Sequence, residues 1–494
     1  MFARLRFYWV VAACGAVLMA LEILSSRILA PHFGNSVYVW GSIISVFLAA
    51  LSLGYLWGGR LADRQPTLAG LGRMVAFAAL VQGLLLLAGL RLAGMLAAWT
   101  GNWSAGPLLA ATVLFGPPSV LLATVSPWAV RLAARDLGHL GNTAGKLYAL
   151  STLGSLAGTL AATFLLIPFL ELRPIMALLT AATAVTALIA MAGSLRAEAP
   201  AALLCAVLIV LSGSGVAFAP KPTGGLVYER VTPYQTLQVH DRDGVRYLES
   251  DRVRQAAVDL ATGEPALPYA RYAALSLLLQ PEMDRALLLG LGGGSVGMYL
   301  QRQLPHLAVD YVDIDPVVPQ VARRYLRFEE GPRGRVHVVD ARRFLQGSAE
   351  HWDLIYCDTY IGLSVPFHLT TVQFLDEVKR HLEPGGVFGL NLAAGLEDAF
   401  SRSIYRTVRE RFRSVYVFRV ATRHNVLVLA SDDPEVDPES LRARARQLDG
   451  RWRFAPKLEL LVRHRTEVEL QAEEVPVLTD EYAPVDRLIR LGTQ

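Results

Sequence analysis

Long apolar runs fill the first 220 residues or so of the chain, and they limit the fold more than any other feature of the sequence. We count about seven of them, each close to the roughly 20 residues that a helix needs to cross the hydrocarbon core of a bilayer. The rest of the chain has an ordinary density of charged residues. We therefore predict an all-α transmembrane bundle in residues 1–220, set in a lipid bilayer, with spans near residues 8–30, 38–59, 74–98, 106–132, 145–170, 174–195 and 200–219.

Basic residues in the short loops predict the orientation of this bundle, because loops rich in Lys and Arg stay in the cytoplasm. They precede the first run and follow the second, fourth and sixth, which predicts a cytoplasmic N-terminus in a bacterial-type inner (plasma) membrane: Arg4, Arg6, Arg60, Arg64, Arg73, Arg131, Arg135, Lys146 and Arg196. Seven spans would place the rest of the chain on the outer side, whereas it would lie in the cytoplasm if one run does not cross. The side of that part is therefore left open.

Two patterns inside the apolar runs carry further information. Glu22 and Arg27 are ionisable groups in the first span, where they either pair with each other or face a transport pathway. Gly154, Gly158 and Ala162 have the spacing of small residues that lets two helices approach closely, so we expect a helix contact there.

The globular part begins after a Pro/Gly-rich linker and shows two patterns. Residues 221–270 contain short alternating segments around an RDG turn, which predicts a small antiparallel β-hairpin region. In residues 271–494 we predict a Rossmann-like α/β domain with a C-terminal tail, because strands alternate with helices from residue 285 onward. Such alternation predicts a parallel sheet that binds ligands at the carboxyl ends of its strands.

Glycines and acidic residues mark these strand ends. The turn GLGGGSVG contains Gly292 and Gly294, and a ligand can approach its backbone closely because glycine has no side chain. Asp313 ends the next strand about twenty residues on, where a carboxylate accepts hydrogen bonds from ribose hydroxyls. Asp340 and Asp358 end the third and fourth strands. Three acidic residues at successive strand ends predict a nucleoside site.

Composition argues against other kinds of site. The formal net charge is only +4, and the globular part has no block of Lys and Arg, so we expect no nucleic-acid partner. Cys14, Cys205 and Cys357 lie far apart, which indicates neither a disulfide framework nor a metal site. We therefore expect a small-molecule ligand and no metal, and we leave a homo-oligomer open.

The order of motifs adds a family resemblance over roughly residues 225–430. The chain resembles the spermidine synthase family of polyamine aminopropyltransferases in the succession YQTLQV, LESDRVRQ, PYARYAAL, the glycine turn, VDID, VVDARRFL, IYCDTY and LEPGGVFGLN. With the membrane part and the closing VLTDEYAPVDRL, residues 477–488, it resembles the membrane-fused members of that family. The resemblance implies a class I AdoMet-type fold.

The resemblance also implies an activity and a set of site residues. The activity is transfer of an aminopropyl group from decarboxylated AdoMet to an amine acceptor, with methylthioadenosine leaving. Asp358 takes the position of the catalytic base. Asp313 is placed at the ribose and Asp340 with Ala341 at the adenine, and the nucleoside site is completed by Gln235, Gln255, Tyr269, Gly292, Gly294 and Ser295.

Some positions depart from the family pattern and leave alternatives open. Ser295 stands where the family has the Asp that holds the aminopropyl amine, and Ala270, Arg271 and Ile361 replace further polar or acidic contacts. A neutral residue at 295 tolerates the carboxylate of AdoMet itself, so one alternative is AdoMet-dependent methyl or aminocarboxypropyl transfer to a lipid-proximal or other unusual acceptor. Another is a non-catalytic nucleoside- or polyamine-sensing module of a transporter-like protein. The tail could restore the missing negative charge through Asp480, Glu481 or Asp486.

Overall fold

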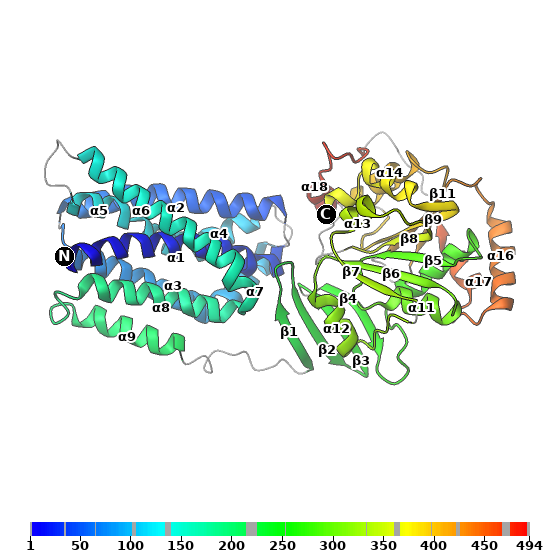
Figure 1. The fold of residues 1–494 in the computed structure, drawn as a ribbon, viewed down its shortest axis with the longest axis horizontal. Coiled ribbons are helices and arrows are strands. Elements are labelled where there is room, and N and C mark those ends of the chain that lie inside the picture. The colour runs from blue at the N-terminus through cyan, green and yellow to red at the C-terminus, as the bar shows by residue number, and fades with distance from the viewer. Residues whose placement is uncertain are drawn as a thin grey trace. The chain divides into compact units, whose positions relative to one another are not determined.

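The chain falls into two compact units, Met1–Thr223 and Gly224–Gln494 (Figure 1). The computed structural model describes residues 2–33, 36–64, 66–100, 105–133, 140–213, 225–251, 253–331, 333–359, 366–396, 398–420, 425–466 and 475–491. Helices make up the regular structure described in the first unit, and both sheets belong to the second.

The first unit is a bundle of long apolar helices. Six stretches in its described residues are long and apolar enough to cross a membrane, by length and composition: Leu5–Phe33, Val37–Arg64, Leu68–Gly89, Gly106–Ala133, Gly141–Phe169 and Leu172–Met191. They are formed by α1 (Phe2–Phe33), α2 (Val37–Arg64), α3 (Leu68–Thr100), α4 (Gly106–Ala123), α5 (Val125–Ala133), α6 (Leu140–Ala161), the π-helical turn η1 (Ala162–Leu166), α7 (Ile167–Phe169) and α8 (Leu172–Met191).

The seventh predicted span, residues 200–219, differs from the other six. Over the described residues it is the apolar helix α9 (Ala199–Gly213), which has 15 residues. At 1.5 Å per residue this helix is about 22 Å long, whereas the hydrocarbon core is about 30 Å thick. The described part of α9 is therefore too short to cross alone, and a seventh span stays a prediction.

The small residues of α6 lie where it packs against α1. A side chain at Gly154 or Gly158 would overlap the carbonyl oxygen of Ala12 or Ala16, and Ser155 Oγ donates a 3.3 Å hydrogen bond to the Gly15 carbonyl. The two backbones can approach this closely because glycine adds no Cβ. The predicted small-residue pattern thus coincides with a helix contact.

The second unit begins with a four-stranded antiparallel sheet in the order β1-β2-β3-β4. Its strands are β1 (Leu226–Val231), β2 (Thr236–Arg242), β3 (Val245–Ser250) and β4 (Val253–Asp259). Asp243 and Gly244 form the two-residue turn between β2 and β3 with φ angles of 53° and 77°. Positive φ at both positions is what a tight hairpin turn requires, and Asp-Gly is a preferred pair there.

An eight-stranded sheet follows in the order β12-β10-β11-β9-β8-β5-β6-β7. Strands β5 to β9 are parallel, whereas β10, β11 and β12 add antiparallel pairs at one edge. The strands are β5 (Arg285–Leu289), β6 (Ala308–Asp313), β7 (Arg335–Val338), β8 (Trp352–Cys357), β9 (Leu382–Leu392), β10 (Ser414–Arg419), β11 (Val426–Ser431) and β12 (Arg465–Thr466).

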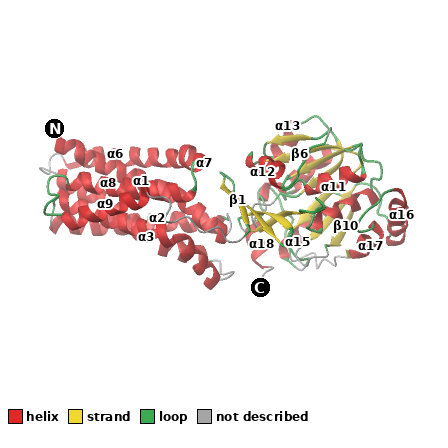
Figure 2. Ribbon diagram, turned by 90° about the horizontal axis from the view of Figure 1, so that it is seen from below, coloured by secondary structure: helices red, strands yellow, loops and turns green. Residues whose placement is uncertain are grey.

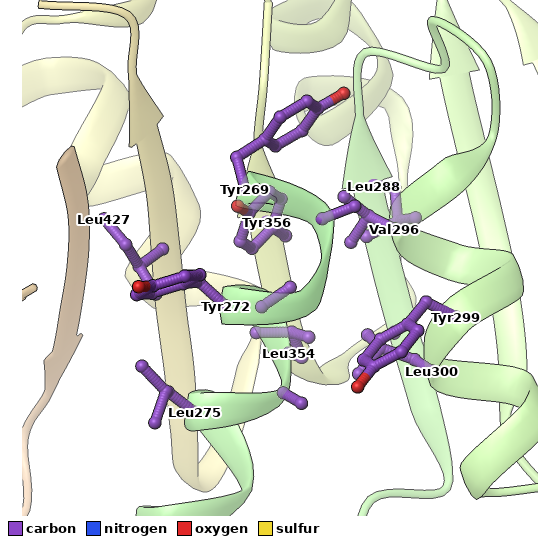
Figure 3. Packing of buried hydrophobic residues seen from close by; sticks show 14 of the residues in the cluster. Tyr269, Tyr272, Leu275, Leu288, Val296, Tyr299, Leu300, Leu354, Tyr356 and Leu427 are labelled. Carbon is purple, nitrogen blue, oxygen red and sulfur yellow. The ribbon is translucent and has the colours of Figure 1, made fainter. Parts of the chain in front are cut away.

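Helices cover both faces of this sheet (Figure 2). Because successive strand residues point to opposite sides, each face of the sheet contributes side chains to a core of its own. Ala286 and Leu288 face one core, which includes α10 (Tyr269–Tyr272), the 3-10 helix η3 (Ala273–Leu278), α11 (Ser295–Gln303), α12 (Val317–Tyr325), α16 (Pro438–Arg451) and α17 (Leu458–Leu461). Part of this core is shown in Figure 3. Leu287 and Leu289 face the other core, with α13 (Ala341–Gly347), α14 (Val372–Arg380), α15 (Ala399–Arg409) and α18 (Val485–Leu491).

The strand order reverses direction next to β5. From β5 the chain moves to β6 and β7 on one side, and it then returns to β8 on the other. Gly290 and Asp358 directly follow the paired strand ends Leu289 and Cys357. Open α/β sheets bind ligands outside the carboxyl ends of strands at such a reversal.

Candidate functional site

A cavity of about 210 Å³ lies at this reversal of the strand order. Its walls come from the small sheet, the start of α10 and the ends of β5, β6, β7 and β8. Eight of the ten predicted site residues line it: Gln235, Gln255, Tyr269, Gly292, Asp313, Asp340, Ala341 and Asp358. The other two, Gly294 and Ser295, lie at the start of α11, where Gly294 is the N-cap and Ser295 is buried.

The glycine turn allows the strand ends to come close together. Gly290 has a φ of 95°, and a Cβ there would overlap the carbonyl oxygen of Asp358. Gly294 has a φ of 71°, and a Cβ there would collide with the Phe328 ring. Both positions therefore need glycine for conformation and for space.

Asp313 is the last residue of β6, and its side chain contacts the glycine turn. Its Oδ2 accepts a 3.1 Å hydrogen bond from the Leu291 N–H, and its Oδ1 accepts a 2.9 Å bond from the Asp315 N–H. Burial raises the pKa of the Asp313 carboxyl to about 6, and these backbone donors act in the opposite direction. At neutral pH the carboxylate is mostly ionised and can accept hydrogen bonds from a ligand.

Gln235 is held in place by a buried hydrogen-bond network that was not predicted from the sequence. Its Nε2 donates to Asp315 Oδ2 over 3.2 Å, and its Oε1 accepts from Ser250 Oγ. Asp315 is fully buried and also accepts a 2.7 Å hydrogen bond from Thr232 Oγ1. Asp315 is the last residue of the VDID motif, and its acidic side chain next to a strand end was the available signal.

Asp358 is the carboxyl group at the end of β8. Its Oδ1 accepts a 2.8 Å hydrogen bond from Asn391 Nδ2, and Asn391 Oδ1 accepts a 3.1 Å bond from Asn425 Nδ2. Burial raises the pKa of Asp358 to about 6, while the bond from Asn391 favours the charged form. No role was predicted for Asn391, although a polar residue near the end of the apolar strand β9 was a usable signal.

Tyr269 closes the cavity next to Asp358. Its hydroxyl donates a 2.8 Å hydrogen bond to the backbone carbonyl of Gln255 in β4, which ties α10 to the small sheet. Burial, and secondarily the negative charge of Asp358, raises the pKa of Tyr269 well above its usual value. Tyr269 therefore stays a neutral hydroxyl beside an acidic group.

Asp340 forms another wall of the cavity. It is the N-cap of α13, where its Oδ1 accepts a 3.0 Å hydrogen bond from the Arg343 N–H. Its Oδ2 lies 3.0 Å from His368 Nε2, and this hydrogen bond lowers the pKa of Asp340. His368 also lines the cavity and was not predicted, because nothing in the sequence links it to a residue 28 positions earlier.

The positions that depart from the family pattern have different surroundings. Ala270 is fully buried, and Arg271 donates a 3.0 Å hydrogen bond to the Pro265 carbonyl and lines a separate hollow with Tyr272 and His464. Ile361 and the side chain of Asp486 lie outside the described part of the structure. In the tail, Asp480 pairs with Arg342, and the residues that line the cavity do not include Asp480 or Glu481.

Comparisons with known proteins identify the family of the chain. Residues 286–386 match a family model described as a methyltransferase domain. A polyamine aminopropyltransferase from Vibrio vulnificus is 30% identical over 279 residues, which cover 53% of this chain and 91% of that protein. The chain belongs to the polyamine aminopropyltransferase family. This membership confirms the predicted resemblance.

Two further proteins are similar to this aminopropyltransferase-family chain. An eEF1A lysine and N-terminal methyltransferase from Bos taurus is 33% identical over 199 residues, which cover 36% of this chain and only 28% of that protein. A probable spermidine synthase from Corynebacterium glutamicum aligns with a TM-score of 0.40 and 19% identity, covering 46% of this chain and 88% of that chain. The chain is thus similar to a protein named as an aminopropyltransferase and to another named as a methyltransferase.

Proposed function

We propose that the protein is a membrane-anchored aminopropyltransferase that transfers an aminopropyl group from decarboxylated AdoMet to an amine acceptor. The observation that carries the proposal is the position of Asp358 at the strand-order reversal, on one cavity with Asp313 and Asp340. Family membership and the six long apolar helices support the two parts of the proposal.

The nucleoside of the donor would occupy the side of the cavity between the glycine turn and α13. Asp313 accepts hydrogen bonds from the ribose hydroxyls, and Asp340 with Ala341 meets the adenine. Gln235, Gln255 and Tyr269 line the same cavity from the small sheet and α10. This arrangement orients the sulfonium centre toward Asp358, and correct orientation supplies much of the rate in such a displacement.

Asp358 has the properties that the reaction needs from a base. The neutral amine attacks the carbon bonded to the sulfonium, a C–N bond forms, and the C–S electron pair stays on sulfur as methylthioadenosine leaves. The new ammonium group then loses a proton. With a pKa of about 6, Asp358 is ionised at neutral pH, so it can align the amine and accept this proton.

Release of methylthioadenosine by the purified full-length protein tests the proposal. With decarboxylated AdoMet and a panel of amines, Asp358→Asn should lower kcat by about 10²- to 10⁴-fold. Asp432→Asn is the matched control, because this exposed carboxylate pairs with Lys379 at 2.8 Å on the surface. No turnover of any amine by the wild type would refute aminopropyl transfer, and equal activity of the two variants would refute the role of Asp358 as the base.

A second candidate is methyl or aminocarboxypropyl transfer from AdoMet itself. The neutral Ser295 at the start of α11 and the methyltransferase match favour it. Calorimetric titration with AdoMet and decarboxylated AdoMet separates the two candidates. Equal or tighter binding of AdoMet, with a selective loss in Ser295→Asp, would favour the second candidate, whereas a preference for decarboxylated AdoMet would support the first.

The six long stretches also support a side for the catalytic unit. An even number of crossings returns the chain to the side of its N-terminus, which the basic loop residues place in the cytoplasm. The unit would then lie where a cytosolic donor is available. Fusions at the C-terminus test this: green fluorescent protein should fluoresce and alkaline phosphatase should be inactive, and the reverse pattern would contradict it.

A further inference from the structure

The tail segment VLTDEYAPVDRL, residues 477–488, is anchored beside the cavity wall that contains Asp340 and His368. Its Leu478 is fully buried, and the Leu478 carbonyl accepts a 2.9 Å hydrogen bond from the N–H of Val372, the first residue of α14. The Leu478 N–H donates a 2.9 Å bond to Thr407 Oγ1 of α15. These bonds fix the backbone of the tail just before Asp480.

The Asp480 side chain forms hydrogen bonds with residues at the start of α13 and at the start of α14. Its carboxylate accepts two hydrogen bonds from Arg342 of α13, at 2.8 and 2.7 Å. It also accepts a 2.7 Å bond from Thr371 Oγ1, the N-cap of α14. Its own N–H donates to Gln373 Oε1 over 3.0 Å. Arg342, and secondarily Thr371, lowers the pKa of Asp480, so it is a carboxylate at neutral pH.

Residues next to the starts of α13 and α14 also form part of the cavity wall. Asp340 and Ala341 directly precede Arg342, and His368 and Leu369 lie two to three residues before Thr371, the cap of α14; all four line the cavity. Arg342 Nη1 also donates a 3.2 Å hydrogen bond to the His368 carbonyl. The Arg342–Asp480 pair therefore links the segments whose side chains meet in the 3.0 Å contact between Asp340 and His368.

We propose that Asp480 is a positioning residue for the donor nucleoside, acting by holding Asp340 and His368 at a fixed separation. This inference rests on the proposed function, because it assumes that a nucleoside occupies the cavity. The Arg342 side chain is only 15% exposed, so without Asp480 its charge loses a bidentate partner that water does not fully replace. The guanidinium would then turn toward Asp340 and compete with His368 for that carboxylate.

Titration of the full-length protein with methylthioadenosine and with decarboxylated AdoMet tests the inference. Asp480→Asn should raise the Kd of both by about tenfold, the effect expected for a lost charge-assisted hydrogen bond. Glu481→Gln removes the same charge from the next tail residue, which is exposed, and should change the Kd less than twofold. In turnover, Asp480→Asn should raise the KM of the donor and leave the KM of the amine unchanged, a split that general destabilisation does not produce.

A milder variant keeps the inference testable if Asp480→Asn does not fold. Thr371→Val keeps the side-chain shape but removes the hydroxyl that donates to Asp480 and that accepts from the Phe374 N–H as the cap of α14. It should weaken donor binding in the same direction by a smaller factor. Equal Kd values for Asp480→Asn, Thr371→Val and Glu481→Gln, with the wild type binding normally, would overturn this inference alone. A wild type that binds neither nucleoside would overturn the proposed function and this inference together.

Discussion

The loss of the proposed aminopropyltransferase activity at low pH is expected to depend on Asn391. Burial raises the pKa of Asp358 to about 6, and the 2.8 Å hydrogen bond from Asn391 acts in the opposite direction by favouring the ionised carboxylate. Such a bond to a charged group contributes about 1.5–3 kcal/mol, and one pKa unit corresponds to about 1.4 kcal/mol. Asn391→Leu removes the amide at similar volume, so it should raise the pKa of Asp358 by about 1–2 units.

Initial rates of methylthioadenosine release from about pH 5 to about pH 9 measure this shift. In the proposed mechanism Asp358 must be ionised to accept the proton that the amine loses, so kcat/KM should fall as the pH drops through its pKa. The inflection is expected near pH 6 in the wild type and at least about one unit higher in Asn391→Leu. The titration of the amine itself is common to both proteins and cancels in the comparison.

A graded control strengthens the test. Asn425→Ala removes the 3.1 Å hydrogen bond to Asn391 Oδ1, so it loosens Asn391 without removing the donor to Asp358. It should give a shift in the same direction but of smaller size. An inflection that stays in place in Asn391→Leu, or that moves to lower pH, would refute the assignment of the acid limb to Asp358.

Two further predictions concern stability and the shape of the site. In the folded protein the pKa of Asp358 is near 6, above its usual value of 3.8. The contribution of this carboxyl group to stability is therefore fully present below about pH 4, and about 3 kcal/mol is lost as the pH rises through 6. Asp358→Asn should therefore raise the Tm of the unliganded protein at about pH 8 but not at about pH 4; a gain at both would contradict this. Gly290→Ala should cost about 1–3 kcal/mol of unfolding free energy, because it adds a Cβ at a φ of 95° against the Asp358 carbonyl. Gly347→Ala, where an added Cβ meets nothing within 4 Å, is its control in denaturant unfolding, and equal losses would refute the steric argument.

Local patterns in the sequence predict a two-part organisation and the residue types that stand at the strand ends. Apolar runs of bilayer length predict the first unit, because in lipid each helix must satisfy its own backbone hydrogen bonds. Alternation of strands and helices predicts the parallel strands β5 to β9, and in a parallel sheet the carboxyl ends meet at one edge. Asp313, Asp340 and Asp358 are therefore brought to one cavity by a rule that the sequence alone expresses.

The tertiary structure decided which side chains hold those carboxylates. Asn391 contacts Asp358 from 33 residues away, His368 contacts Asp340 from 28 residues away, and Asp480 contacts Arg342 from 138 residues away. No local periodicity encodes such pairs, because each depends on how two separate segments pack. The antiparallel edge strands β10 to β12 also arise from pairing between distant segments. Residue types thus determined the chemistry available at the strand ends, and packing determined the geometry and pKa at which that chemistry operates.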